Sequence, residues 1–422
     1  MSAGCLASRT WLVALVLTLS LATFVLLKHQ LLPCVEVSLR PVAHTTATGL
    51  HGGVSHYAVA YNSALLHIFV KGVVREGGQH WVRGFVSLEN GQEADPTGKR
   101  GAALSDVRIG VEVPGIDTAW GRLESFDCLL QSGALDCLGS RRVRPTWFSF
   151  MVNNVTHSRL VVKYCDSYIP LSPILASAPE FVSQKNRVRH ILSTNYGALE
   201  KPAVFMKWME VQLHHHEQLK IEGTTHYCRP FDCFALRQYF SISPMPKQLE
   251  LVDWTHILPK NHSVRYHDQA VQYNHAVLSF YGTGSYLFIA DIDEYLMAAP
   301  LDSKSCLMRF LDMRKCISLS VFSALPDPEV SSSMELTSQL KYISSKNHSI
   351  KSFIDPDVGF GFGVHEGAVC MNFTPTGCTI GNACARLTAD CAQIAHYRNM
   401  FRQRETLSAE FMYNDTWYRL EG

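Results

Sequence analysis

The amino-acid sequence predicts an α/β domain, preceded by a β-rich module and by an apolar N-terminal segment. Three observations support this division. Strand-like and helix-like segments alternate after Pro179, which is typical of an α/β domain with a largely parallel sheet. Before Pro179, short strand-like runs are separated by loops rich in Gly, Asn, Asp and Pro. Near the N-terminus, residues 11–27 form an unbroken apolar run.

The apolar run, WLVALVLTLSLATFVLL, contains no charged side chain and reaches the short limit for a helix that spans a bilayer. Lys28, His29 and Gln30 follow it, where a cleaved signal peptide would have a small-x-small cleavage site. We therefore expect a transmembrane signal anchor at 11–27, a cytoplasmic tail at 1–10 and a stem at 28–41. A cleaved signal peptide and a buried helix are the alternatives.

The distribution of cysteines and glycosylation motifs predicts a lumenal body. One of the thirteen cysteines, Cys5, precedes the apolar run, and an even number follows it, which suits disulfide pairing in a secretory compartment. The net charge of +1, without a long basic run, argues against a nucleic-acid partner. Asn-x-Ser/Thr motifs occur at Asn154, Asn261, Asn347, Asn372 and Asn414. Short-loop pairings open to the cysteines are Cys228–Cys233, Cys306–Cys316 and Cys378–Cys384.

Residues 42–179 are expected to form the β-rich lumenal module. Their short strands at regular spacing are typical of a β-sandwich. The predicted strands are 58–61, 66–74, 81–88, 107–113 and 160–164.

Residues 187–422 are expected to form the α/β domain. Its predicted strands are 188–193, 249–252 and 286–290, and its predicted helices are 201–220 and 267–281. The run 286–290 is continuously apolar, as expected of a strand that is buried on both faces.

The acidic residues directly after this buried strand carry the main chemical signal. Asp291 and Asp293 are two residues apart, so in an extended backbone their side chains point the same way. In open α/β sheets, ligands bind beyond the carboxyl ends of the strands. Two carboxylates there suit Mg²⁺ or Mn²⁺, which takes its other ligands from water and a diphosphate. The pattern thus predicts a site for a metal and a phosphorylated ligand.

Two other interpretations of the acidic pair stay open at this point. The first is a solvated acidic turn after a core strand. The second is a phosphohydrolase of the haloacid dehalogenase type, which also places D-x-D after a strand. In that class the motif normally opens the domain and continues with Thr or Val, whereas Glu294 and Tyr295 follow here, deep in the chain.

The order of several sequence blocks resembles glycosyltransferase family 92, formerly a domain of unknown function. The blocks are VRHILSTNYG, FMKWMEVQLHHHEQL, DQAVQYNHAVLSF, FIADIDEYL, GVHEGAV and AHYR, spread over about residues 188–400. The resemblance implies a GT-A type nucleotide-diphospho-sugar transferase domain in a single-pass type II Golgi membrane protein. Characterised members transfer galactose from UDP-galactose in β linkage with inversion, usually with Mn²⁺. The first 180 residues match the family only loosely.

Carried over onto this sequence, the resemblance implies that Asp291 and Asp293 bind the metal and the diphosphate. His365 is the candidate third metal ligand, and His396 is the alternative, since a neutral imidazole suits Mn²⁺. A structural, hydrogen-bonded histidine is the plainer interpretation of His365. The expected nucleotide-binding residues are Ser193, Thr194, Asn195 and Arg398.

An inverting transfer requires a general base that deprotonates the acceptor hydroxyl. Glu366, Asp355 and Asp357 are the candidates, with Asp268 and Glu294 behind them. The resulting expectation is a hexosyltransferase that moves galactose from UDP-galactose to a glycan or glycoprotein acceptor with Mn²⁺ or Mg²⁺. The remaining alternative is a catalytically inactive carbohydrate-binding protein, with the β-rich module as the binder.

Overall fold

The computed structural model describes the strands, the helices and the segments close to them, and all structural statements below refer to these residues. They are 40–41, 51–61, 64–75, 79–88, 107–112, 118–121, 124–125, 146–152, 159–164, 167–173, 180–185, 187–193, 202–242, 248–254, 265–326, 340–362, 367–374, 377–397 and 417–419. Residues 11–27, where the anchor is expected, lie outside these ranges. In the part of the chain that the structure does describe, no helix is both long and apolar enough to cross a membrane.

The first half of the chain forms two antiparallel sheets packed face to face. The larger sheet has the order β1 (Arg40–Pro41), β2 (Ser55–Tyr61), β3 (Ala64–Arg75), β4 (Gln79–Leu88), β8 (Thr146–Val152) and β7 (Glu124–Ser125). The smaller has the order β10 (Ser167–Pro173), β9 (Arg159–Tyr164), β5 (Val107–Glu112) and β6 (Ala119–Gly121). Alternate apolar side chains of both sheets, such as Ile68, Val82, Ile109 and Val162, share one buried core. This arrangement is a β-sandwich, as the strand spacing predicted.

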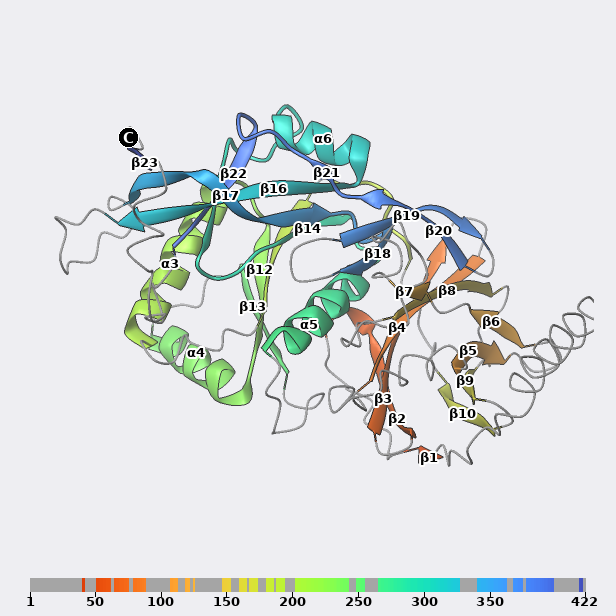
Figure 1. The fold of residues 1–422 in the computed structure, drawn as a ribbon. Coiled ribbons are helices and arrows are strands. Elements are labelled where there is room, and N and C mark those ends of the chain that lie inside the picture. Colours follow the sequence, from red (N-terminus) through yellow and green to blue (C-terminus); the bar gives the residue numbers. More distant parts are fainter. Residues whose placement is uncertain are drawn as a thin grey trace, which may run out of the picture.

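The second half is an α/β domain around a ten-stranded sheet (Figure 1). Its main path runs β13 (Leu249–Asp253), β12 (Gly223–Cys228), β11 (Arg187–Leu192), β14 (Ser285–Ile289), β17 (Leu340–Ile354), β16 (Cys316–Pro326), β22 (Ala392–His396) and β15 (Glu294–Ala298). The short strands β21 (Ala385–Arg386) and β23 (Trp417–Arg419) pair with β16 and β17. A separate three-stranded sheet contains β18 (Gly359–Phe362), β19 (Gly367–Thr374) and β20 (Gly377–Ala383).

The expectation of a largely parallel sheet is wrong for the pairings of β17 and for β15 with β22, although β16 pairs parallel with β21 and β22. Strands β13, β12, β11 and β14 are parallel neighbours, but β17 pairs antiparallel with both β14 and β16. Parallel neighbours need a crossover connection, which the helices before β14 supply, whereas antiparallel neighbours do not. The long strands after α6 (Cys306–Arg314) therefore extend the sheet as antiparallel pairs.

The helices cover both faces of the parallel part of the sheet. Figure 1 shows α5 (Arg265–Ser279) on one side of β12 and β13, and α3 (Pro202–Gln218) and α4 (Pro230–Ile242) on the other. Successive strand residues alternate between the two cores: Ile191 packs with α5 residues, while Leu192 packs with Trp208 of α3. Strand side chains point alternately to opposite faces of the sheet, and both faces are covered by helices. Both sets of side chains are therefore buried, which explains the continuous apolar runs of these strands.

The sandwich packs directly against α5 and is not a detached module. Phe69, Phe85 and Trp147, from its larger sheet, lie in the same buried core as Val277 and Leu278 of α5. Polar groups cross the junction as well. The Trp147 indole Nε1 donates to Asn274 Oδ1 (2.5 Å), and the Lys71 ammonium donates to the Ser279 carbonyl (2.5 Å). The two halves therefore share a core.

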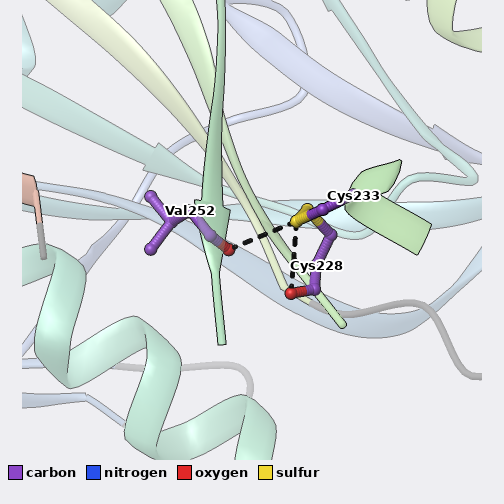
Figure 2. Close-up of a disulfide and its surroundings, with 3 residues drawn as sticks. All are labelled: Cys228, Cys233 and Val252. Carbon is purple, nitrogen blue, oxygen red and sulfur yellow. Dashed lines mark hydrogen bonds between the residues drawn. A yellow bond between two sulfur atoms is a disulfide. The ribbon is translucent and has the colours of Figure 1, made fainter. Parts of the chain in front are cut away.

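Among the residues that the structure describes, three disulfides fasten the α/β domain. Cys228–Cys233 joins the end of β12 to the first turn of α4, as its short loop suggested. Figure 2 shows this bond, with the Cys233 sulfur 3.9 Å from the carbonyl oxygen of Val252. The two other short-loop pairings are wrong for Cys306, Cys316 and Cys384. The pairs are Cys306–Cys391 and Cys316–Cys384, because the sheet brings distant segments beside α6 and β16.

Candidate active site

The acidic turn lies where the sequence predicted, at the carboxyl end of the buried strand β14. All five residues of β14 are buried, and Asp291 to Asp293 connect it to β15. The turn is closed by its own groups. Glu294 N donates to the Asp291 carbonyl (3.1 Å), and the Glu294 carboxylate accepts from Asp291 N (2.7 Å). Glu294 is thereby committed to the turn and is only 2% exposed, so it is not placed as a general base.

Helix α3 holds this turn from outside the sheet. The Trp208 indole donates to the Ile292 carbonyl, and Gln212 Nε2 donates to the Glu294 carbonyl (2.8 Å). Both side chains are buried, so these hydrogen bonds satisfy carbonyl groups that would otherwise lie unpaired in the core. The sequence block FMKWMEVQL therefore contains residues that support the acidic turn.

The Asp291 carboxylate is bonded by protein groups on both of its oxygens. Oδ1 accepts from Gln269 Nε2 (2.6 Å) and from the Tyr273 hydroxyl (3.1 Å), both on α5. Oδ2 accepts from the Lys351 ammonium on β17 (2.7 Å), which also lies 3.6 Å from Glu294. Asp291 therefore sits in a network that joins three elements of the domain.

Asp293 faces a histidine from the far end of the chain. Strand β22 pairs antiparallel with β15 so that His396 lies opposite Glu294. His396 Nε2 is 3.3 Å from Asp293 Oδ2, and the Tyr397 backbone N–H donates to the Asp293 carbonyl (2.8 Å). Both side chains keep partial access to solvent, 18% for Asp293 and 13% for His396. The structure places His396, the alternative late histidine, at the acidic turn.

The electrostatics of the site follow from burial and from these pairings. Burial raises the pKa of Glu294 to about 7. Burial also opposes ionisation of Asp291, but the Lys351 ammonium outweighs it and lowers the pKa of that carboxyl. For His396, burial favours the neutral ring, yet the Asp293 carboxylate beside it raises the net pKa. The site is thus a compact array of alternating charges.

Ser193 belongs to the same network, whereas several predicted residues lie outside the described ranges. Ser193 follows β11, and its Oγ is 3.2 Å from the Tyr273 hydroxyl that contacts Asp291. This places Ser193 beside the acidic turn, at the same edge of the sheet. The site candidates that fall outside the described residues are Thr194, Asn195, His365, Glu366 and Arg398.

Asp355 and Asp357, predicted as candidate bases, are not brought to the acidic turn. Ile354 pairs with Leu287, so Asp355 lies near the amino end of β14, opposite to Asp291. There Lys185 Nζ is 2.8 Å from Asp355 and also forms an ion pair with Asp357, which accepts from Gly282 N (2.7 Å). Because β17 runs antiparallel to β14, the chain passes from the carboxyl end of β14 towards its amino end as it approaches Asp355. We therefore no longer consider these two carboxylates as candidate bases.

Lys351 is the site residue that the sequence reasoning missed. It is 1% exposed and stands in the strand segment Ile350–Ile354, among residues of β17 that pack in the core. Lysine is rarely fully buried unless it is paired, so a single lysine in such a run was a usable signal. Gln269 and Tyr273 were seen only as helix residues of α5.

The Asp293–His396 pair has the chemistry of a divalent-metal site but is incomplete on its own. Carboxylate and imidazole both suit Mn²⁺. Neighbouring ligands of an octahedral ion at about 2.1 Å are about 3 Å apart, close to the 3.3 Å between Asp293 Oδ2 and His396 Nε2. Across the described residues, no group of three or more His, Cys, Asp or Glu side chains is arranged to hold a metal. The pair therefore fits a metal that takes its other ligands from substrate and water.

The fold and the site define a class of protein: an α/β domain with charged groups gathered beyond the carboxyl end of a buried parallel strand, where such folds bind ligands. Residues 238–419 match the family model of glycosyltransferase family 92. The chain therefore carries a family 92 domain and is a glycosyltransferase. The matched region contains α5, β14, the acidic turn, Lys351 and His396, whereas the blocks around β11 and α3 precede it.

Comparison with other known proteins adds little to this assignment. No curated protein matches the chain. A 4-diphosphocytidyl-2C-methyl-D-erythritol synthase is similar with 13% identity and a TM-score of 0.23, over 42% of this chain and 78% of its own. HddC from Yersinia pseudotuberculosis is similar with 11% identity and a TM-score of 0.24, over 51% of this chain and 96% of its own. At these TM-scores we draw no argument from either likeness.

Proposed function

We propose that the protein is an inverting, metal-dependent galactosyltransferase with a GT-A type domain, which transfers galactose from UDP-galactose to a glycan acceptor. The observation that carries the proposal is the meeting of Asp293 and His396 beyond β14, inside the family 92 domain. The choice of galactose, the β linkage and inversion are supported by the family resemblance of the sequence blocks.

In this proposal the residues of the acidic turn have different roles in binding the donor. Asp293 and His396 hold Mn²⁺ or Mg²⁺ against the donor diphosphate, and Asp291 supports the turn from the α5 side. The metal, when bound, neutralises charge that develops on the leaving diphosphate. Ser193, Thr194 and Asn195 line the nucleotide pocket after β11, and Arg398 meets a phosphate.

The general base of the proposed reaction is Glu366, the first of the candidates from the sequence, and Asp268 is the remaining alternative. Inversion needs one carboxylate that accepts the acceptor hydroxyl proton on the face opposite the diphosphate. Residues 363–366 follow β18, whose last residue is tied to α5: Asn274 donates to the Phe362 carbonyl (2.6 Å) and accepts from Phe362 N (2.9 Å). These bonds support a fixed starting point for the segment that carries Glu366.

We also propose that the enzyme is a type II Golgi membrane glycoprotein with a lumenal catalytic domain. Residues 11–27 would be the anchor, and the Asn-x-Ser/Thr motifs would be glycosylated in the lumen. The disulfides found among the described residues support this location, because structural disulfides persist in the secretory pathway and are rare in the cytosol.

The test is a donor assay on the purified full-length protein. UDP release would be measured with a panel of nucleotide sugars, in Mn²⁺, in Mg²⁺ and in chelator. We expect UDP-galactose to be used best, turnover to stop in chelator, and Asp293→Asn to lose at least about 100-fold in rate, as is typical when a group that stabilises transition-state charge is removed. Asp302→Asn, at an acid with 44% exposure outside the turn, is the matched control. Equal rates for Asp293→Asn and the control, or no use of any donor, would refute the proposal.

A further inference from the structure

Lys351 is a charged residue in a place where the fold alone does not call for one. It lies on β17, beside the strand that carries the acidic turn, and its side chain is 1% exposed. Burying an ammonium group costs several kcal/mol unless it is well paired. Its position is therefore explained by its partners at the acidic turn.

Those partners distinguish the two aspartates of the turn. Asp291 receives Lys351 on one oxygen, at 2.7 Å, and Gln269 and Tyr273 on the other, at 2.6 and 3.1 Å. Asp293 instead faces His396, a residue able to share a metal ion with it. The first carboxylate is thus bonded to the protein, and the second faces a potential ligand.

We propose that Lys351 is a positioning residue that serves as a built-in countercation for Asp291, so that the metal is held by Asp293 and His396 without Asp291. This inference rests on the proposed metal-dependent function. It assigns Asp291 to the support of the turn, although the D-x-D pattern alone predicts two equivalent metal ligands.

The arrangement also makes metal binding depend on the donor. One carboxylate and one imidazole leave most positions of an octahedral ion to water and phosphate oxygens. The Lys351 ammonium adds a positive charge on the Asp291 side, which disfavours a free cation there. The protein without nucleotide should therefore bind Mn²⁺ weakly, and UDP should tighten that binding strongly.

The test measures Mn²⁺ binding by electron paramagnetic resonance on the full-length protein, with and without UDP. In Lys351→Met, Asp291 loses its countercation and becomes available to the metal. We expect Mn²⁺ without UDP to bind about tenfold tighter or more, since one nearby positive charge is removed. The matched control is Lys71→Met, at a second buried strand lysine that bonds the Ser279 carbonyl, far along the chain from the acids. It should lower stability but leave Mn²⁺ affinity unchanged.

A double variant keeps the inference testable if Lys351→Met does not fold. Asp291→Asn with Lys351→Met replaces the ion pair by a neutral pair, and Mn²⁺ affinity with UDP should stay within about threefold of the wild type, because the net charge is conserved. If the double variant lost Mn²⁺ binding, or if Lys351→Met and the control had equal Mn²⁺ affinities, the inference about Lys351 would be overturned. The metal site proposed at Asp293 and His396 would still stand. If the wild type binds no Mn²⁺ with UDP, or Asp293→Asn binds it normally, the proposed metal site fails and this inference with it.

Discussion

Arg83 offers the sharpest test of whether the sandwich and the α/β domain form one cooperative unit. Its side chain comes from β4 of the sandwich and is fully buried at the junction. The guanidinium donates to the carbonyl groups of Pro356 (2.9 Å) and Asp357 (3.2 Å), between β17 and β18, and to that of Gly359, the first residue of β18. It also lies 4.5 Å from the centre of the Tyr281 ring. Replacing Arg83 by Met keeps most of the volume but removes every donor.

The magnitude follows from the three carbonyl groups that would be left buried. Each unpaired buried acceptor costs about 1–3 kcal/mol, and relaxation of the segment recovers part of that, so Arg83→Met should lower the unfolding free energy by about 3–5 kcal/mol. The matched control is Arg159→Met, which removes a half-exposed arginine 3.2 Å from Glu112. A surface ion pair of that kind contributes about 0–1 kcal/mol.

The assay is urea unfolding followed by tryptophan fluorescence and by circular dichroism. One shared transition that moves to lower urea in Arg83→Met supports a common unit. A loss below about 1 kcal/mol, equal to that of the control, would refute the reasoning from the carbonyl groups. Two separate transitions, with only one of them shifted, would show that the sandwich unfolds on its own.

Three further predictions concern the α/β domain. Removing Cys306–Cys391 by Ala substitutions should lower the unfolding free energy by about 3 kcal/mol in the same urea assay, less than its separation of 85 residues alone implies, because Cys316–Cys384 already closes most of that loop. Burial, with a neighbouring histidine, lowers the pKa of His190 to about 3, so below pH 6.5 the unfolded chain binds more protons than the folded one. Stability should therefore fall as the pH drops from 6.5 towards 4. His190→Leu should flatten this slope by up to about 1.4 kcal/mol per pH unit, measured by unfolding at pH 7, 6 and 5. Tyr273→Phe removes the hydroxyl that donates to Asp291, and we expect it to raise the KM for the donor by about tenfold, the worth of one hydrogen bond to a charged group, in UDP-release kinetics.

Hydrophobic periodicity was sufficient to predict the elements whose secondary structure depends on local sequence. Strand β14 and helix α5 lie within two residues of their predicted bounds, because a continuous apolar run and a 3.6-residue repeat each specify one kind of element. The same reasoning placed the acidic turn at a strand end. It missed β12, and it overextended the parallel sheet, since strand pairing depends on how segments meet in space.

The sequence by itself determined the two-part division, the buried strand β14 and the pair of aspartates that follows it, and its ordered blocks identified the family. Only the tertiary structure decided which groups meet at that pair. Lys351 reaches Asp291 because β17 lies antiparallel beside β14, and His396 reaches Asp293 because β22 pairs with β15. The same antiparallel pairing carries Asp355 to the opposite edge of the sheet. The physical reason is that the chemistry of each side chain depends only on which residue stands at that position. The contacts that differentiate two identical carboxylates depend on strand order and direction.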